Sequence, residues 1–282
     1  SKDYNLTITS SNNDSLGSEN FSVIDSIITI YPEDEISLDI FYNPDSYGLH
    51  EALLNISEIS DTLGQNINVL LIGESVSGTD VSGVVSGIWT LEGSPYLVTE
   101  DLTISPYTSL IIDPLVSIVF MGNYHLVVNG VLNVNGTETD LVNFQSTGNW
   151  GGINFEYSTG ESNISHALIT GTDGNAISSY YSQAINISNV DIDGFNGRAI
   201  SIDDTFSDVT ISNTTIQNGS GDVYIFAQDT FLHLDNVTMD SNNNSSEGIS
   251  YGGTGSFSIS NSTITNFTDK CIYLSGSSMD YT

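Results

Sequence analysis

Basic residues are almost missing from this chain. Lys and Arg total 3, at Lys2, Arg198 and Lys270, against 35 Asp and Glu, and the formal net charge is −32 over 282 residues. Binding to nucleic acid or to anionic membranes needs clustered Lys and Arg, so the composition excludes both partners. Such an acidic surface attracts divalent cations, which leaves calcium as a possible ligand. No other cofactor is indicated.

Cysteine and long apolar runs are equally scarce. Cys271 is the only cysteine, so no intrachain disulfide can form, and its place between Lys270 and Ile272 predicts a buried core thiol. No run of 18 apolar residues is present, which excludes a transmembrane helix. Apolar residues never keep helical spacing for three turns. These absences favour an all-β protein that does not insert into a membrane.

The sequence does contain a short motif that is repeated about every 24 residues. Its copies are Ile164–Ile169, Ile187–Ile192, Ile211–Ile216, Leu234–Met239 and Ile259–Ile264. A fixed period in this range is typical of stacked repeats, in which each unit buries its apolar face against its neighbours.

Within each repeat, apolar and polar residues alternate, as in Ile200-Ser201-Ile202 and Phe257-Ser258-Ile259. Alternation indicates short half-buried strands, and the Gly, Asn, Asp and Ser residues between them indicate turns. We therefore predict a right-handed parallel β-helix of about seven coils with ~24 residues each.

One position is polar in every copy of the motif. It is occupied by His166, Asn189, Asn213, Asn236 and Asn261. Neighbouring coils lie about 4.8 Å apart, so these side chains would stack, and each amide could donate to the next carbonyl. We interpret them as a structural ladder, with His166 as a variant rung and with Asn213, Asn236 and Asn261 inaccessible.

The first eighty residues do not follow this period. They contain six runs typical of strands, at Tyr4–Thr9, Phe21–Val23, Ile27–Tyr31, Ile36–Tyr42, Ala52–Ile56 and Ile67–Ile72. Short strands at close spacing with turns between them favour an antiparallel sandwich. We predict a sandwich over residues 1–76, a linker and cap over 77–86, and the β-helix over 87–282.

Both parts resemble known families. The segments Gly87–Thr90, Leu102–Ile104, Leu110–Pro114, Ser117–Phe120, Leu126–Gly136 and Trp150–Phe155 resemble the first coils of secreted right-handed parallel β-helix proteins of the pectin-lyase-like superfamily. The segments Ile30–Glu35, Leu38–Pro44 and Leu71–Ser75 resemble immunoglobulin-like domains of the abnormal-spindle/hydin type, without their usual opening strand. The resemblance implies the fold and a secreted or cell-surface location. It implies little about activity, because one fold hosts many functions.

Enzymes of that superfamily act on polysaccharides, which directs attention to a few charged residues. A hydrolase needs two carboxylates on neighbouring coils, and the candidates are Asp203 and Asp204, with Arg198 nearby in the sequence and His233 one or two coils away. We expect these Asp residues to be turn residues instead. A lyase needs a basic residue, and Arg198 and Lys270 are too far apart to act together.

Two other sites are weaker candidates. The spacing of Asp191 and Asp193, followed by glycine, could hold Ca²⁺, but later calcium-loop ligands are missing. The aromatic residues Tyr180, Tyr181, Tyr224, Phe226 and Tyr251 could form a sugar-binding strip, or they could face inward.

The sequence favours a structural role over catalysis. We expect a secreted or cell-surface protein that forms a stalk, layer, adhesin or filament by end-to-end self-association, or by contact with other modules of the same assembly. The sequence shows no capping helix after the last strand and an incomplete amino-terminal sandwich, so both ends look open to pairing. The alternatives are a polysaccharide hydrolase or lyase and a glycan-binding adhesin.

Overall fold

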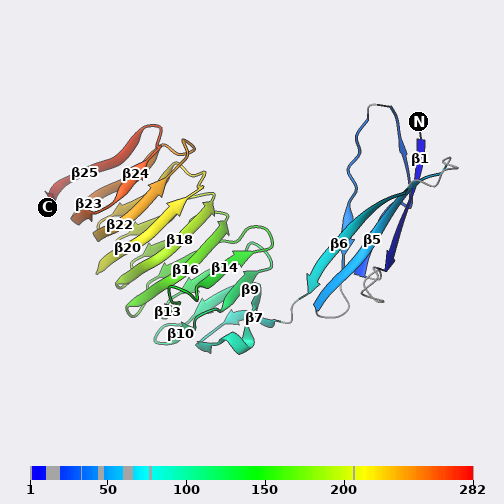
Figure 1. Ribbon diagram of the computed structural model, residues 1–282. Coiled ribbons are helices and arrows are strands. Elements are labelled where there is room, and N and C mark those ends of the chain that lie inside the picture. Colours follow the sequence, from blue (N-terminus) through cyan, green and yellow to red (C-terminus); the bar gives the residue numbers. More distant parts are fainter. Residues whose placement is uncertain are drawn as a thin grey trace. The chain divides into compact units, whose positions relative to one another are not determined.

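The computed structural model describes residues 2–10, 20–32, 34–43, 48–59, 66–75, 78–205 and 207–281. The described residues are almost entirely strands and turns, with one short 3-10 helix at Leu91–Gly93. Contacts divide the chain into two units, Ser1–Ser77 and Gly78–Thr282 (Figure 1). In the described residues, no helix has the length and apolar character needed to cross a membrane.

The first unit is built from two small antiparallel sheets. Its strands are β1 (Lys2–Ser10), β2 (Phe21–Val23), β3 (Ile27–Ile30), β4 (Ile40–Tyr42), β5 (Gly48–Glu58) and β6 (Asn66–Ser75). Strands β3, β1, β5 and β6 form a four-stranded sheet in that order, and β2 pairs with β4. Among the described residues, each of the six predicted strands is present at approximately its predicted position, and these strands form two small antiparallel sheets.

The core of the first unit is small. Leu6, Ala52 and Leu54 are buried. Phe21 packs on Tyr42 with ring centroids 4.9 Å apart, and the Tyr42 hydroxyl lies 2.7 Å from Nδ1 of His50. The edge strand β6 leaves much apolar surface uncovered.

The second unit is a parallel β-solenoid. Its strands are β7 (Thr79–Val84), β8 (Gly87–Trp89), β9 (Tyr96–Ile104), β10 (Ser109–Ile112), β11 (Ser117–Phe120), β12 (Leu126–Val128), β13 (Val131–Asn135), β14 (Val142–Ser146), β15 (Ile153–Glu156), β16 (Ser162–Thr172), β17 (Ile177–Tyr180), β18 (Ile185–Phe195), β19 (Ile200–Asp203), β20 (Asp208–Gln217), β21 (Val223–Gln228), β22 (Phe231–Asp240), β23 (Glu247–Ser260), β24 (Thr263–Thr265) and β25 (Lys270–Tyr281).

The solenoid has about eight turns, one more than the sequence predicted. The difference arises at its start, because β7 lies in the segment assigned to a linker and cap yet pairs in parallel with β9.

Strand register arranges the solenoid in three parallel sheets. Sheet I contains β8, β10, β13, the first halves of β16, β18, β20 and β22, and the second halves of β23 and β25. Sheet II contains the first halves of β7 and β9, β11, β14, the second halves of β16, β18, β20 and β22, and β24. Sheet III contains the second halves of β7 and β9, β12, β15, β17, β19, β21, and the first halves of β23 and β25. Figure 1 shows the strands stacked coil on coil.

The interior is a continuous apolar column. Alternate residues of each strand point inward, so Ile164 lies in register with Ile187, and Ile187 with Ile211, and all three are buried. Trp150 is buried in this column, where its ring stacks on Phe120 with centroids 4.1 Å apart. The repeat spacing and the alternation predicted from the sequence are confirmed.

From β16 onward, each coil turns from sheet I to sheet II through a left-handed residue. His166, Asn189, Asn213, Asn236 and Asn261 have φ between 48° and 55° and form the corner between sheets I and II. Asn and Gly adopt this conformation at lower cost than other residues. The recurring Asn therefore suits the backbone conformation that the corner requires.

Hydrogen bonding at this corner differs from a continuous ladder. The Asn236 amide donates to Oδ1 of Asn213 over 2.8 Å, but Asn261 donates to Asp235, and His166 contacts Ser165 through Nδ1. Asn213, Asn236 and Asn261 are exposed, so the expectation that they are inaccessible is wrong. They lie at the outside of the bend, where the side chain points away from the core.

Amide ladders of the expected kind lie on the outer face of sheet I. Asn163 donates to Asn133 over 3.2 Å, and Asn186 donates to Asn163 over 3.0 Å. These bonds join three successive coils through side chains in matching register.

Cys271 also departs from its expected environment. The thiol is exposed and lies 3.4 Å from the carbonyl oxygen of Ile264. It belongs to β25, which pairs with β23 alone among the described strands, so no further coil covers it.

We predict that the conformational requirement at the corner outweighs the amide contact. Asn213→Ala should lower the free energy of unfolding by about 1–2 kcal/mol, the cost of a left-handed backbone for a residue with a Cβ and no local hydrogen bond. Asn213→Gly removes the same amide and should cost markedly less, because glycine tolerates this φ. Urea unfolding of both variants checks the difference; equal losses would contradict the prediction.

Candidate functional site on the third sheet

The outer face of sheet III brings aromatic and charged side chains together. Strand register places Glu156, Tyr180, Asp203 and Gln228 in one row. The residues that follow them, Tyr157, Tyr181, Asp204 and Asp229, form the left-handed corner between sheets III and I, with φ between 47° and 50°. Two adjacent rows over four coils thus form one surface strip.

Local sequence explains how this strip is presented. In β19, Ile200 and Ile202 are buried, so Asp203 points outward. Asp204 then adopts φ 48°, which turns the chain toward sheet I. The following Thr205 is buried, and its hydroxyl lies 3.1 Å from that of Ser179. The expectation of turn residues fits Asp204, while Asp203 ends a strand.

Arg198 lies on the same sheet but forms a different contact. Its guanidinium carbon lies 4.1 Å from the centroid of the Phe226 ring, and Nη1 donates to the Ser201 hydroxyl over 3.1 Å. Within the described residues, no ion pair joins Arg198 to Asp203 or Asp204.

His233 is separated from the other predicted catalytic residues. It lies on β22 in sheet I, where its Nδ1 lies 2.8 Å from the Ser258 hydroxyl of the next coil. Asp203 lies on sheet III. The structure therefore brings Asp203 and Asp204 together and leaves His233 on another face.

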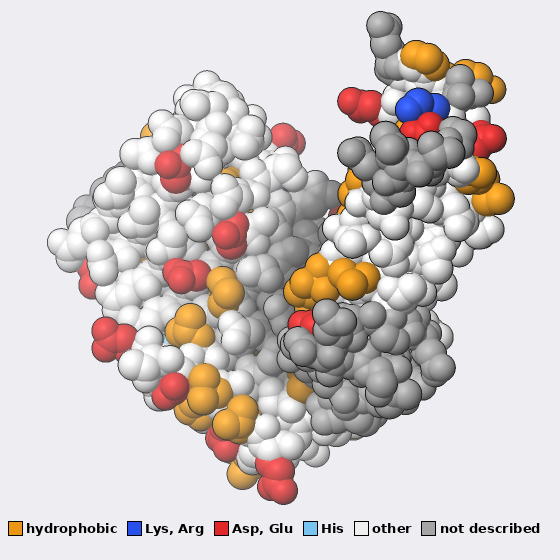
Figure 2. Space-filling view, turned by 45° about the vertical axis from the view of Figure 1, so that its right-hand side comes forward, with side chains coloured by type: hydrophobic (Ala, Val, Ile, Leu, Met, Phe, Trp, Pro, Cys, Tyr) orange, Lys and Arg blue, Asp and Glu red, His pale blue; other side chains and the backbone are white. Residues whose placement is uncertain are grey.

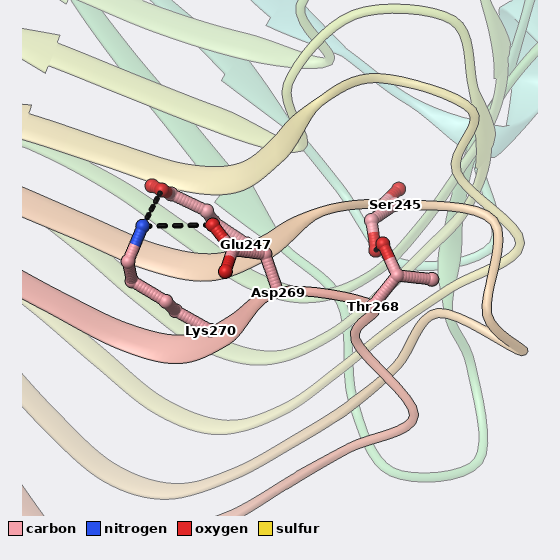
Figure 3. A network of polar contacts seen from close by, with 5 residues as sticks. All are labelled: Ser245, Glu247, Thr268, Asp269 and Lys270. Carbon is pink, nitrogen blue, oxygen red and sulfur yellow. Dashed lines mark hydrogen bonds and ion pairs between the residues drawn. The ribbon is translucent and has the colours of Figure 1, made fainter.

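Lys270, the other basic residue of the solenoid, is engaged in ion pairs. Its Nζ lies 2.8 Å from Asp269 and 3.2 Å from Glu247, and Figure 3 shows it between the two carboxylates. The pairs raise the pKa of Lys270. The bond to Glu247 connects β25 to β23, which gives this lysine a structural role.

The candidate calcium residues lie on sheet II. Asp191 and Asp193 are two residues apart on β18 and so share its outer face. Asp193 accepts hydrogen bonds from Asn218 over 2.7 Å and from Gln217 over 3.4 Å. Among the described residues, no three His, Cys, Asp or Glu side chains are grouped to hold a metal ion; calcium binding stays a prediction.

The aromatic residues divide into two groups. Tyr224 and Tyr251 are buried, and the Tyr251 hydroxyl donates to the Thr230 carbonyl over 2.7 Å. Tyr180 and Tyr181 lie at the surface, and Tyr157, which the sequence analysis missed, joins them. The sequence contains a signal for Tyr157, because Tyr157 and Tyr181 are 24 residues apart and each is followed by serine.

Charges in the strip influence one another. Burial raises the pKa of Asp203, the charges of Asp204 and Asp229 raise it further, and Arg198 opposes the rise. Hydrogen bonds from Thr254 lower the pKa of Asp229. The Tyr181 hydroxyl donates to Asp204, and this bond together with the carboxylate charge raises the pKa of Tyr181 to about 12.

No protein-family model, curated protein or solved structure matches this chain. The functional argument therefore depends on the geometry of the described residues.

The link between Tyr181 and Asp204 can be tested by titration. In Asp204→Asn, the pKa of Tyr181 should fall toward its ordinary value of 10.0, because the carboxylate no longer stabilises the protonated hydroxyl. NMR of ring-labelled tyrosine, with Tyr181→Phe to assign the signal, measures this change. Glu138→Gln removes an exposed carboxylate elsewhere and serves as the control; an unchanged Tyr181 pKa in Asp204→Asn would refute the link.

Proposed function

We propose that this protein is a secreted or cell-surface structural module whose solenoid serves as a rigid spacer. The observation that carries the proposal is the use of outward polar side chains. Many of them bond to the neighbouring coil, as in Asn133–Asn163–Asn186 on sheet I and Asp193–Asn218–Asn242 beside sheet II. Side chains committed to coil-to-coil bonds stiffen the stack.

Surface charge supports an extracellular spacer. Figure 2 shows acidic side chains scattered over the visible face among uncharged polar ones. A net charge of −32 keeps such a protein dispersed and discourages non-specific contacts. We further propose a right-handed β-helix of the pectin-lyase-like type, preceded by an immunoglobulin-like module; the parallel three-sheet solenoid and the small antiparallel sheets support these assignments.

We place self-association at the edge strand β6. Ile67, Val69, Leu70 and Ile72 are all more than 40% exposed, and among the described strands β6 pairs with β5 alone. An exposed apolar edge strand offers unpaired backbone groups and apolar surface to another chain. The partner would be a second copy or another module of the same assembly.

Light scattering over a concentration series, with and without Ca²⁺, tests this assignment. The mass should rise with concentration, and Ile72→Lys should reduce the rise because a charge opposes edge pairing. The matched variant Ile88→Lys changes an equally exposed isoleucine of the solenoid and should associate normally. A protein that stays monomeric throughout would contradict the proposal.

A polysaccharide-active enzyme or a glycan-binding adhesin is the second candidate. It is favoured by one observation, the adjacent carboxyl groups of Asp203 and Asp204 at the outer face of sheet III, where burial and the charge of Asp204 raise the pKa of Asp203, since a glycosidase works with a pair of carboxyl groups. Release of reducing sugar by the protein, lost in Asp203→Asn and in Asp204→Asn, would establish hydrolysis and overturn the structural proposal. We expect no release from either the parent protein or the variants.

A further inference from the structure

Two tyrosines, Tyr157 and Tyr181, have left-handed backbone angles that other residue types adopt at lower cost. The corner between sheets III and I is formed by Tyr157, Tyr181, Asp204, Asp229 and Gly253, with φ of 50°, 47°, 48°, 49° and 82°. Gly and Asp adopt the left-handed region readily, whereas a bulky aromatic residue is strained there. Burial does not compensate for the strain at Tyr157, whose side chain is 61% exposed.

The tyrosines form an exposed aromatic cluster. The rings of Tyr157 and Tyr181 are nearly parallel, at 7° with centroids 5.8 Å apart. Tyr180 stands edge-on to both, at 80° to Tyr181 and 85° to Tyr157, and is 42% exposed. This tyrosine cluster (Tyr157, Tyr180 and Tyr181) presents aromatic surface to solvent beside the corner.

Carboxylates adjoin the tyrosine cluster on the next coils. Asp203 follows Tyr180 in its row, and Asp204 follows Tyr181 and accepts its hydroxyl hydrogen bond. Asp229 lies one coil further. In the described part of the chain, no ion pair neutralises these three carboxylates. The charge of Arg198 acts on Asp203 without forming an ion pair, so the three carboxylates together stay net negative, and aromatic faces beside net negative charge attract organic cations.

We infer that the tyrosine cluster and its three carboxylates form a docking site for arginine side chains of a basic partner segment. A planar guanidinium can stack on tyrosine while its fork of donors meets a carboxylate. The same sheet already holds one guanidinium over an aromatic ring, where Arg198 lies over Phe226, although its Nη1 donates to the Ser201 hydroxyl and not to a carboxylate. Charge complementarity favours this occupant over a neutral sugar, whose hydroxyls can donate hydrogen bonds to the carboxylates but gain no ionic attraction from them.

The inference goes beyond the spacer role and is tested separately from it. The probe is a fluorescein-labelled peptide of alternating arginine and glycine, with a citrulline counterpart of equal shape and no charge. Fluorescence anisotropy at about 0.15 M salt limits long-range attraction to the acidic surface. We expect the arginine peptide to bind at least about tenfold more tightly than the citrulline peptide.

Variants then locate the binding. Tyr157→Asn and Tyr181→Asn keep a residue suited to the left-handed corner, so the fold should survive while the affinity falls by about tenfold. Asp204→Asn should weaken binding several-fold. The controls are Glu100→Gln, which removes an exposed carboxylate of β9, and Phe231→Ala, which removes an exposed aromatic ring of β22; both should bind within about twofold of the parent.

Three outcomes would overturn the inference. Equal loss of affinity in Asp204→Asn and Glu100→Gln would show non-specific attraction to net charge. Unchanged affinity in Tyr157→Asn and Tyr181→Asn, with their circular dichroism intact, would remove the aromatic cluster from the site. Binding of a neutral oligosaccharide that is lost in these tyrosine variants, without discrimination between arginine and citrulline, would assign the site to sugars.

Discussion

The structure of the solenoid depends on the left-handed corner between its sheets. From β15 onward, the chain passes from one sheet to the next at a residue with positive φ, whereas earlier bends, such as the one between β12 and β13, do without it. Such residues are Asn189, Asn213 and Asn236 between sheets I and II, and Tyr181, Asp204 and Asp229 between sheets III and I. Few residue types adopt this conformation at low cost. Residues of these types therefore recur in the sequence once per coil.

The stacking of equivalent residues, in the core and on the surface, depends on the same corner. Once it fixes the length of each coil, equivalent residues stack, so isoleucine lies on isoleucine inside and amide on amide outside. The inner column excludes water, and outer pairs such as Asn163 with Asn186 add directional bonds between coils. Polar side chains engaged in this way are consistent with a spacer role.

The repeat made the solenoid predictable, because its period is visible in the residues that corners require. The repeated Asn of the corner between sheets I and II was found in the sequence, but it was interpreted as a ladder of inaccessible side chains and not as a corner. The corner between sheets II and III was missed, because no single residue type marks it. Successive coils have Gly171, Gly194 and Asn218 at this bend. Sequence alone could not separate His233 from Asp203, because sheet assignment depends on the register of several corners at once.

Burial was the least predictable property. Asn213 fills a recurrent position yet is exposed, Tyr251 resembles the surface tyrosines in sequence yet is buried, and Cys271 is exposed because no further described coil covers it. Alternation shows which residues share a face but not which face is inside when both carry Tyr, Ser and Asn. The 24-residue spacing of Tyr157 and Tyr181 relates these two tyrosines in the sequence, but their ring contact with each other and with Tyr180 is visible only in the structure.

The most direct test of this account is a measurement of the backbone angles at the corners. A crystal structure, or NMR scalar and residual dipolar couplings, would determine φ at Asn189, Asn213 and Asn236. The account predicts 55°, 48° and 54° at these positions, repeated one coil after another. Negative φ at these residues, with the strands still parallel, would show that another feature sets the coil and would contradict the account.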